Sequence, residues 1–148
     1  MVELSGAEAE LHNKLCHVDS WYWAQHAQIE LQGGNIYNTA NHEYQIGPLQ
    51  SDHPYQVWRK AAQMGITELM VIRTLHRMIK QYYNKGVLYL FPTEGDVSDF
   101  SKARFKPLID ANPEISRHIK NTDATNIKQI GKAMLYLRGA RASNQKIE

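Results

Sequence analysis

The strongest pattern in this 148-residue sequence is a helical repeat that runs from Glu68 to about Tyr83. Apolar side chains recur there every three or four residues, at Leu69, Ile72, Leu75 and Ile79. This spacing predicts a helix with one buried face, which ends before Gly86 because glycine readily adopts the left-handed cap conformation. The continuous apolar run 87–91, closed by Pro92, then predicts a strand buried on both faces, as in a parallel sheet.

The segment before this helix predicts the remaining part of a βαβ unit. Residues 55–59 are rich in the aromatic and β-branched types that favour a strand, and residues 60–67 predict a loop with one glycine. Strand, loop, long helix and buried strand follow one another in the order of a right-handed crossover between parallel strands. The predicted fold class is therefore α/β, a three-layer arrangement in which helices cover a sheet.

Shorter elements are expected on both sides of this unit. A helix with Ser5 as its N-cap is predicted from Gly6 to about Cys16, and a second helix from Asp19 to about Leu31. Beyond the buried strand, the sequence predicts a helix over 95–104 capped by Asp96 or Ser98, helical turns that start at Pro107 and Pro113, and strands over 126–130 and 133–137. We expect two regions, a helical and loop-rich lead-in over 1–50 and a core over 51–148.

The loop before the long helix is the main candidate for a binding site, and it reads Lys60-Ala61-Ala62-Gln63-Met64-Gly65-Ile66-Thr67. In a phosphate-binding P-loop, G-x-x-x-x-G-K-[ST], backbone N–H groups hold the phosphates, a lysine neutralises them and the last hydroxyl binds Mg²⁺. Gly65 and Thr67 match this pattern, whereas Ile66 replaces the usual lysine and Lys60 replaces the first glycine. Lys60 is the only cation in the loop, so its side chain would have to fold back over the phosphates. A plain strand-end lysine beside an ordinary turn glycine is the alternative interpretation.

Three segments, 60–68, 87–100 and 135–140, occur together in an order typical of one family. The sequence resembles the ATPase region of large terminase subunits from lambda-like tailed phages, most closely from about Gln45 to Ala140. That family carries a deviant Walker A loop whose lysine comes early, so the resemblance gives this role to Lys60. The strand that ends in Pro-Thr also resembles the segment after the P-loop helix in helicases.

The resemblance implies a partial P-loop NTPase core that binds ATP and Mg²⁺, with the Thr67 hydroxyl on the metal, and that drives viral DNA into an empty capsid. It implies double-stranded DNA, a small terminase subunit and the portal as partners, a homo-oligomer in the intact protein, and the cytoplasm of the host bacterium as location. In related motors, a glutamine upstream of the P-loop recognises adenine. Gln45, or else Gln50, is the candidate for this role, and a polar loop glutamine is the alternative.

One part of the family pattern has no match. No segment reads as several apolar residues followed by Asp-Glu, which would help to hold Mg²⁺ and orient the attacking water, and the nuclease domain of full-length members has no counterpart. We therefore expect an incomplete ATPase core that binds nucleotide but releases phosphate no faster than its Lys60→Ala variant. A non-catalytic remnant or interaction module, and a helicase-like translocase fragment, are the alternatives.

Composition argues against several other classes of protein. The single cysteine, Cys16, excludes an internal disulfide framework and leaves the scattered histidines without a closed set of zinc ligands. A net charge of +2 is too small to indicate nucleic-acid binding by itself. No apolar run approaches membrane-spanning length, which fits the expectation of a cytoplasmic protein.

Several other polar and aromatic residues have simple structural interpretations. The aromatic cluster 21–23 predicts packing rather than base stacking. Arg73, Arg77 and Lys80 are expected on the solvated side of the long helix, and His76 is expected to be partly exposed.

Overall fold

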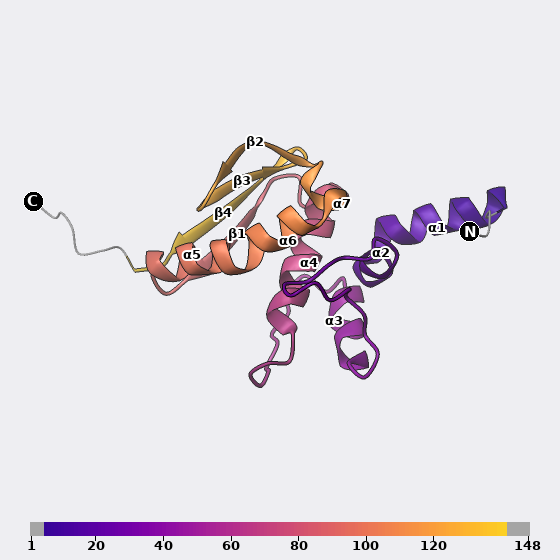
Figure 1. Cartoon of the computed structure of the whole chain (residues 1–148), viewed down its shortest axis with the longest axis horizontal. Coiled ribbons are helices and arrows are strands. Elements are labelled where there is room, and N and C mark those ends of the chain that lie inside the picture. The colour runs from indigo at the N-terminus through magenta and orange to yellow at the C-terminus, as the bar shows by residue number, and fades with distance from the viewer. Residues whose placement is uncertain (1–4, 142–148) are drawn as a thin grey trace, which may run out of the picture.

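The structure, a computed structural model, describes residues 5–141 except for the side chains of residues 121–123. Its first part is helical: α1 (Gly6–Val18), α2 (Ser20–His26), the 3₁₀ turn η1 (Glu43–Gln45) and α3 (Ile46–Gln50) precede the long helix α4 (Ile66–Ile79). Helix α1 buries none of its residues and extends away from the sheet (Figure 1). The predicted first helix and long helix are therefore present, with α4 starting slightly earlier than expected.

The N-termini of the first two helices are fixed by side chains. Ser5 forms the predicted cap, because its hydroxyl accepts from the N–H of Glu8 while the Glu8 carboxylate accepts from the N–H of Ser5. Asp19 accepts hydrogen bonds from two backbone N–H groups at the start of α2. Helix α2 stops at His26 rather than at Leu31, because Gln28 adopts a φ of 49°, which a helix does not allow.

The second part of the chain builds a four-stranded mixed sheet in the order β1-β4-β3-β2. Strand β1 (Val87–Phe91) pairs in parallel with β4 (Ala133–Gly139), whereas β3 (Ile127–Ile130) runs antiparallel to both β4 and β2 (Ile119–Ala124). Between β1 and the later strands lie α5 (Glu94–Phe100), the π-helical turn η2 (Ser101–Phe105), α6 (Lys106–Ala111) and α7 (Pro113–Ser116). The predicted mixture of helices and a sheet is confirmed.

Helix α5 starts one residue earlier than predicted and has a different cap. The Thr93 side chain accepts from the N–H of Asp96, and the Asp96 carboxylate accepts from the N–H of Thr93. Asp96 is thus the reciprocal partner of the capping box rather than the N-cap residue itself.

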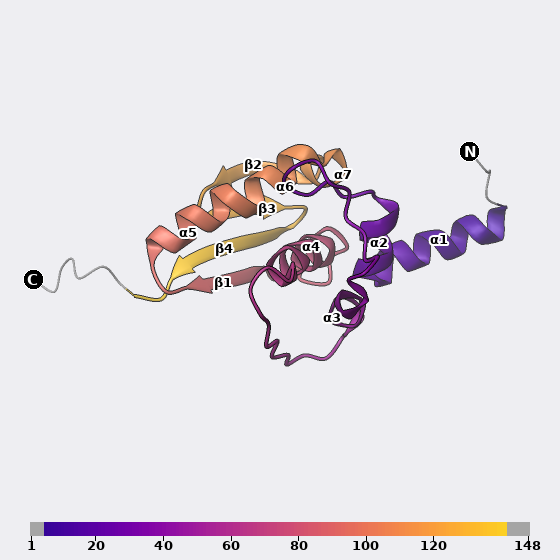
Figure 2. The same ribbon diagram turned by 60° about the horizontal axis from the view of Figure 1, so that its bottom comes forward.

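Helices α4 and α5 to α6 pack on the same face of the sheet (Figure 2). The Tyr89 hydroxyl of β1 lies 2.8 Å from Thr74 Oγ1 of α4, and the Phe91 and Phe100 ring centroids are 4.9 Å apart. The opposite face is open, since Leu88 and Leu90 are 57% and 64% exposed. The prediction that this strand is buried on both faces is therefore wrong, because no described element covers its outer side.

The predicted strand over 55–59 is also absent. This stretch belongs to an irregular segment over 51–60, here called the strap, in which Val57 is 97% exposed. The strap runs from α3 to the loop before α4 and is held by side chains of α4 instead of by a neighbouring strand. Within residues 5–141, no helix is both long enough and apolar enough to span a lipid bilayer.

Candidate functional site

The loop over 60–67 presents an uncapped helix end. Gly65 is the N-cap residue of α4 and adopts φ 70° and ψ 2°, the left-handed conformation that glycine tolerates best. In the described part of the chain, no side chain caps α4, whereas Ser5, Asp19 and Thr93 cap the helices that follow them. The first-turn N–H groups of α4 and the positive end of its dipole are suited to an anion.

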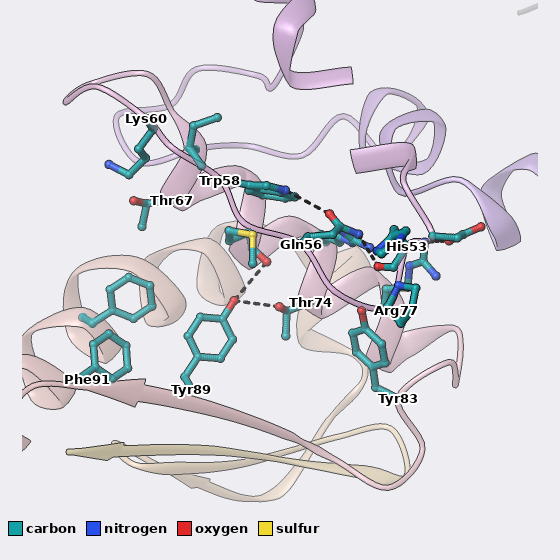
Figure 3. Close-up of a pocket in the computed structure, with 16 residues that line it drawn as sticks. His53, Gln56, Trp58, Lys60, Thr67, Thr74, Arg77, Tyr83, Tyr89 and Phe91 are labelled. Atoms are coloured by element: carbon teal, nitrogen blue, oxygen red, sulfur yellow. Dashed lines mark hydrogen bonds and ion pairs between the residues drawn. The ribbon is translucent and has the colours of Figure 1, made fainter. Parts of the chain in front are cut away.

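Lys60 and Thr67 lie at one end of a cavity of about 800 Å³ (Figure 3). Lys60 is exposed and Thr67 is half-buried, and both side chains come from the two ends of the same loop. Ile66 also lines this cavity, while the other predicted loop residues, Ala61, Ala62, Gln63, Met64 and Gly65, form the turn beside it. The structure thus places an ammonium group and a hydroxyl together beside the N-terminus of α4.

Gln45 contacts the loop at Met64 and is not one of the residues that line the cavity. Its side-chain Oε1 accepts from the Tyr37 hydroxyl at 3.2 Å, and its Nε2 donates to the Met64 carbonyl at 3.0 Å. A β-carbon added at Gly65 would lie 2.8 Å from Gln45 Nε2. Gln45 therefore holds the loop in place, and the other upstream glutamine, Gln50, donates to Asp19 at 2.6 Å.

The far end of the cavity contains two arginines of α4 that were expected in solvent. Arg73 and Arg77 are only 8% and 7% exposed, so that expectation is wrong. Arg73 donates to the carbonyls of Pro48 and Ser51 at 3.1 and 2.6 Å and to the side chain of Gln56, and Arg77 pairs with Asp52. The cause is the strap, which crosses this side of α4 and covers both side chains.

Aromatic rings form the walls between these two ends. Trp58 lies on the strap side, opposite Tyr89 and Phe91 of β1 (Figure 3). The Trp58 Nε1 donates to the Gln56 Oε1 at 3.1 Å, which fixes the edge of the ring. Burial raises the pKa of Tyr89 to about 12, so its hydroxyl stays neutral and bonded to α4. Trp58 was not predicted from the sequence as a site residue. Its position two residues before Lys60 could have indicated that it lies near the loop.

His76 is another residue whose environment differs from the expectation. It is fully buried, accepts from Ser20 Oγ at Nδ1 over 2.8 Å, and donates from Nε2 to the Cys16 carbonyl over 2.9 Å. Desolvation lowers its pKa to about 4, so the ring is neutral near pH 7. The predicted partial exposure is wrong because the lead-in packs over this part of α4.

The lead-in contains histidines and a cysteine, residue types that can bind a metal ion. His12 Nε2 lies 3.6 Å from Cys16 Sγ, and His12 Nδ1 lies 3.1 Å from the Tyr22 hydroxyl. Among the side chains that the structure describes, no group of three or more from His, Cys, Asp or Glu is placed to hold a metal ion.

A lysine and a hydroxyl lie beside the uncapped end of a helix in a mixed α/β domain, an arrangement whose charge and N–H groups suit an anion. Residues 49–146 match the family model described as phage terminase large subunit gpA, ATPase domain. The chain therefore belongs to the gpA family of phage terminase large subunits, as its sequence resemblance predicted, and membership in an ATPase domain family implies nucleotide binding. Neither the curated proteins nor the solved structures give a match.

Proposed function

We propose that this chain binds ATP and Mg²⁺ at the 60–67 loop and forms the ATP-binding part of the motor that translocates viral DNA into the capsid. The observation that carries this proposal is the meeting of Lys60 and Thr67 at the N-terminus of α4 in a member of an ATPase family. This arrangement offers three features that a triphosphate requires: a cation, a metal-binding hydroxyl and free backbone donors.

Each part of the loop has a distinct proposed role. The Lys60 ammonium neutralises the β and γ phosphates, and the Thr67 hydroxyl holds Mg²⁺, which offsets phosphate charge when it is bound. The backbone of Ala61, Ala62, Gln63, Met64, Gly65 and Ile66 surrounds the phosphates. Gln45 supports this backbone through Met64. Its predicted recognition of adenine stays a proposal, which requires its amide to leave both present partners.

The cavity supplies binding groups but no evident catalytic carboxylate. Among the described residues that line it, Asp52 is the only acidic side chain, and its carboxylate is paired with Arg77 at the end remote from Thr67. We therefore assign nucleotide binding to these residues and assign no general base.

The finer architecture is part of the same proposal. We propose a P-loop NTPase core over 51–148 with a lead-in over 1–50, and the start of the family match at residue 49 supports this division. The parallel pair of β1 and β4 and the open outer face of the sheet are compatible with a three-layer fold. Double-stranded viral DNA, a small terminase subunit, the portal and further copies of the chain are the proposed partners, in the host cytoplasm.

A binding titration with ATP and Mg²⁺ tests this proposal. Lys60→Ala is expected to weaken ATP binding about tenfold or more, because it removes a charge-assisted contact with phosphate. Thr67→Ala is expected to weaken binding mainly when Mg²⁺ is present, since the hydroxyl acts on the metal. Lys132→Ala, which removes an exposed lysine from the turn between β3 and β4, is the matched control and should leave affinity unchanged. Equal affinity in all four proteins would refute the site.

A further inference from the structure

We propose that the base of the bound nucleotide stacks on the ring of Trp58, in the aromatic middle of the cavity. This inference rests on the proposed function, because it requires phosphates at Lys60 and Thr67. It gives the base a stacking partner, Trp58, that neither the sequence resemblance nor the family match assigns.

The first support is the shape of the cavity. It extends along α4 from Thr67 to Arg77, and ten residues of helix correspond to about 15 Å. Its volume of about 800 Å³ lies in the range of small-molecule sites, roughly 300 to 1,000 Å³. A triphosphate held at the Lys60 end leaves the space beside Trp58 for the rest of the nucleotide.

The second support is the chemistry of the middle of the cavity. Trp58 faces Tyr89 and Phe91 across this space, and Met70 also lines it (Figure 3). Aromatic and apolar walls favour a planar, weakly hydrated ring, whereas an inorganic phosphate would leave them unfilled. A cationic ligand is disfavoured, because Lys60, Arg73 and Arg77 all line the same cavity.

The third support is the way in which Trp58 is held. Its Nε1 donates to the Gln56 Oε1 at 3.1 Å, and the same oxygen accepts from Arg73 at 2.9 Å. The Arg73 guanidinium carbon lies 5.9 Å from the centre of the Trp58 ring. Because the polar edge of the ring is engaged and the Arg73 guanidinium lies over one face, the remaining apolar face is the part available to a ligand. A ring fixed in this way loses little conformational entropy when a base stacks on it.

The test compares ATP with inorganic tripolyphosphate, both with Mg²⁺, on the full chain. The ratio of their dissociation constants isolates the contribution of the base and sugar. We expect wild type to prefer ATP, and Trp58→Ala to reduce this preference by between about 5-fold and about 150-fold, the range for base stacking on an aromatic side chain. Affinity for tripolyphosphate should not change, whereas Lys60→Ala should weaken both ligands.

Two further variants keep the test decisive. Trp58→Phe retains a ring and should keep most of the preference for ATP, while Trp21→Phe, in the lead-in and outside the cavity, is the control. Tryptophan fluorescence of the wild type should change with ATP but not with tripolyphosphate, and this change should be absent in Trp58→Phe. An unchanged ratio in Trp58→Ala, or a ratio abolished only by Gln45→Ala, would overturn the inference. Failure of both ligands to bind wild type would instead refute the proposed function on which it rests.

Discussion

At the scale of single residues, the contact between Gly65 and Gln45 determines the shape of the proposed phosphate loop. Gly65 combines a left-handed backbone with the close approach of a buried amide that is already bonded to Met64 and Tyr37. Only glycine meets both conditions without strain, because any side chain would both oppose the positive φ and displace Gln45.

Gly65→Ala should therefore lower the free energy of unfolding by about 1 to 2 kcal/mol, the cost of the left-handed conformation for a residue with a β-carbon. Chemical denaturation measures this change. The matched control is Gly47→Ala in α3, where an added β-carbon meets nothing within 4 Å, and where alanine should be neutral or slightly stabilising. Equal effects of the two substitutions would contradict the assigned contact.

His76 provides a second prediction at this scale, concerning acid stability. Its pKa is about 4 in the folded chain and about 6.5 when exposed, so the unfolded state binds more protons between these values. The contribution is fully present above about pH 6.5 and is lost as the pH falls toward 4, so unfolding at about pH 4.5 should be easier by about 2 kcal/mol than at about pH 7. His76→Gln does not titrate there and should lose correspondingly less stability. The same pH dependence in both proteins would show that His76 is not buried as described.

Some residues of the proposed site could be selected from the sequence, and others could not. Lys60 and Thr67 could be paired because a P-loop pattern is local, with a fixed spacing at the start of a helix. Arg73, Arg77 and His76 were misjudged because their burial depends on segments distant in the sequence, the strap and the lead-in. The spacing of apolar residues predicts the one helix face that packs on the sheet. It does not predict that other segments cover the polar residues on the remaining faces.

At the scale of elements, the strap is held by α4 through side chains. Arg73 bonds to the carbonyls of Pro48 and Ser51 and to Gln56, so one guanidinium connects the end of α3, the start of the strap and its middle, next to Trp58. Lysine cannot reproduce this forked geometry. Together with the Arg77–Asp52 ion pair, these contacts hold the strap in position over the cavity.

Arg73→Lys should release the strap and destabilise the chain by about 1 to 3 kcal/mol, because partly buried carbonyl groups lose a hydrogen-bond donor. Trypsin should then cleave faster after Arg59 or Lys60, which are exposed. Arg117→Lys, at an exposed arginine paired with Glu114, is the control and should not change cleavage in the strap. Unchanged cleavage in Arg73→Lys would mean that the strap is held by other contacts.

The elements themselves were predicted unevenly. Strands β3 and β4 and helix α4 follow from clear periodicity and a glycine turn, and they were found close to their expected bounds. Strand β2 was missed because it is an edge strand with a mostly polar sequence between Ile119 and Ala124. The segment 55–59 has strand-forming residues but no pairing partner in the described chain, which shows that β-propensity depends on a neighbouring strand.

At the scale of the whole molecule, one helical layer covers one face of a mixed sheet. The predicted mixture of helices and strands was sufficient for the α/β class. The parallel partner of β1 was not predicted, because β4 takes the place that was expected for residues 55–59. The open outer face of β1 was not predicted, because Leu88 and Leu90 belong to a continuous apolar run that is typical of a buried strand and yet are exposed. The long helix is central to the molecule, since the lead-in, the strap and the sheet all contact it.

The most direct test of nucleotide binding at the 60–67 loop is a crystal structure of the chain with Mg²⁺ and an ATP analogue that is not hydrolysed. The account predicts the triphosphate at the N-terminus of α4, with the Lys60 ammonium and the backbone N–H groups near Gly65 within hydrogen-bond distance of phosphate oxygens, and Mg²⁺ beside the Thr67 hydroxyl. Phosphates bound elsewhere, for example between Arg73 and Arg77 with Lys60 free in solvent, would contradict it.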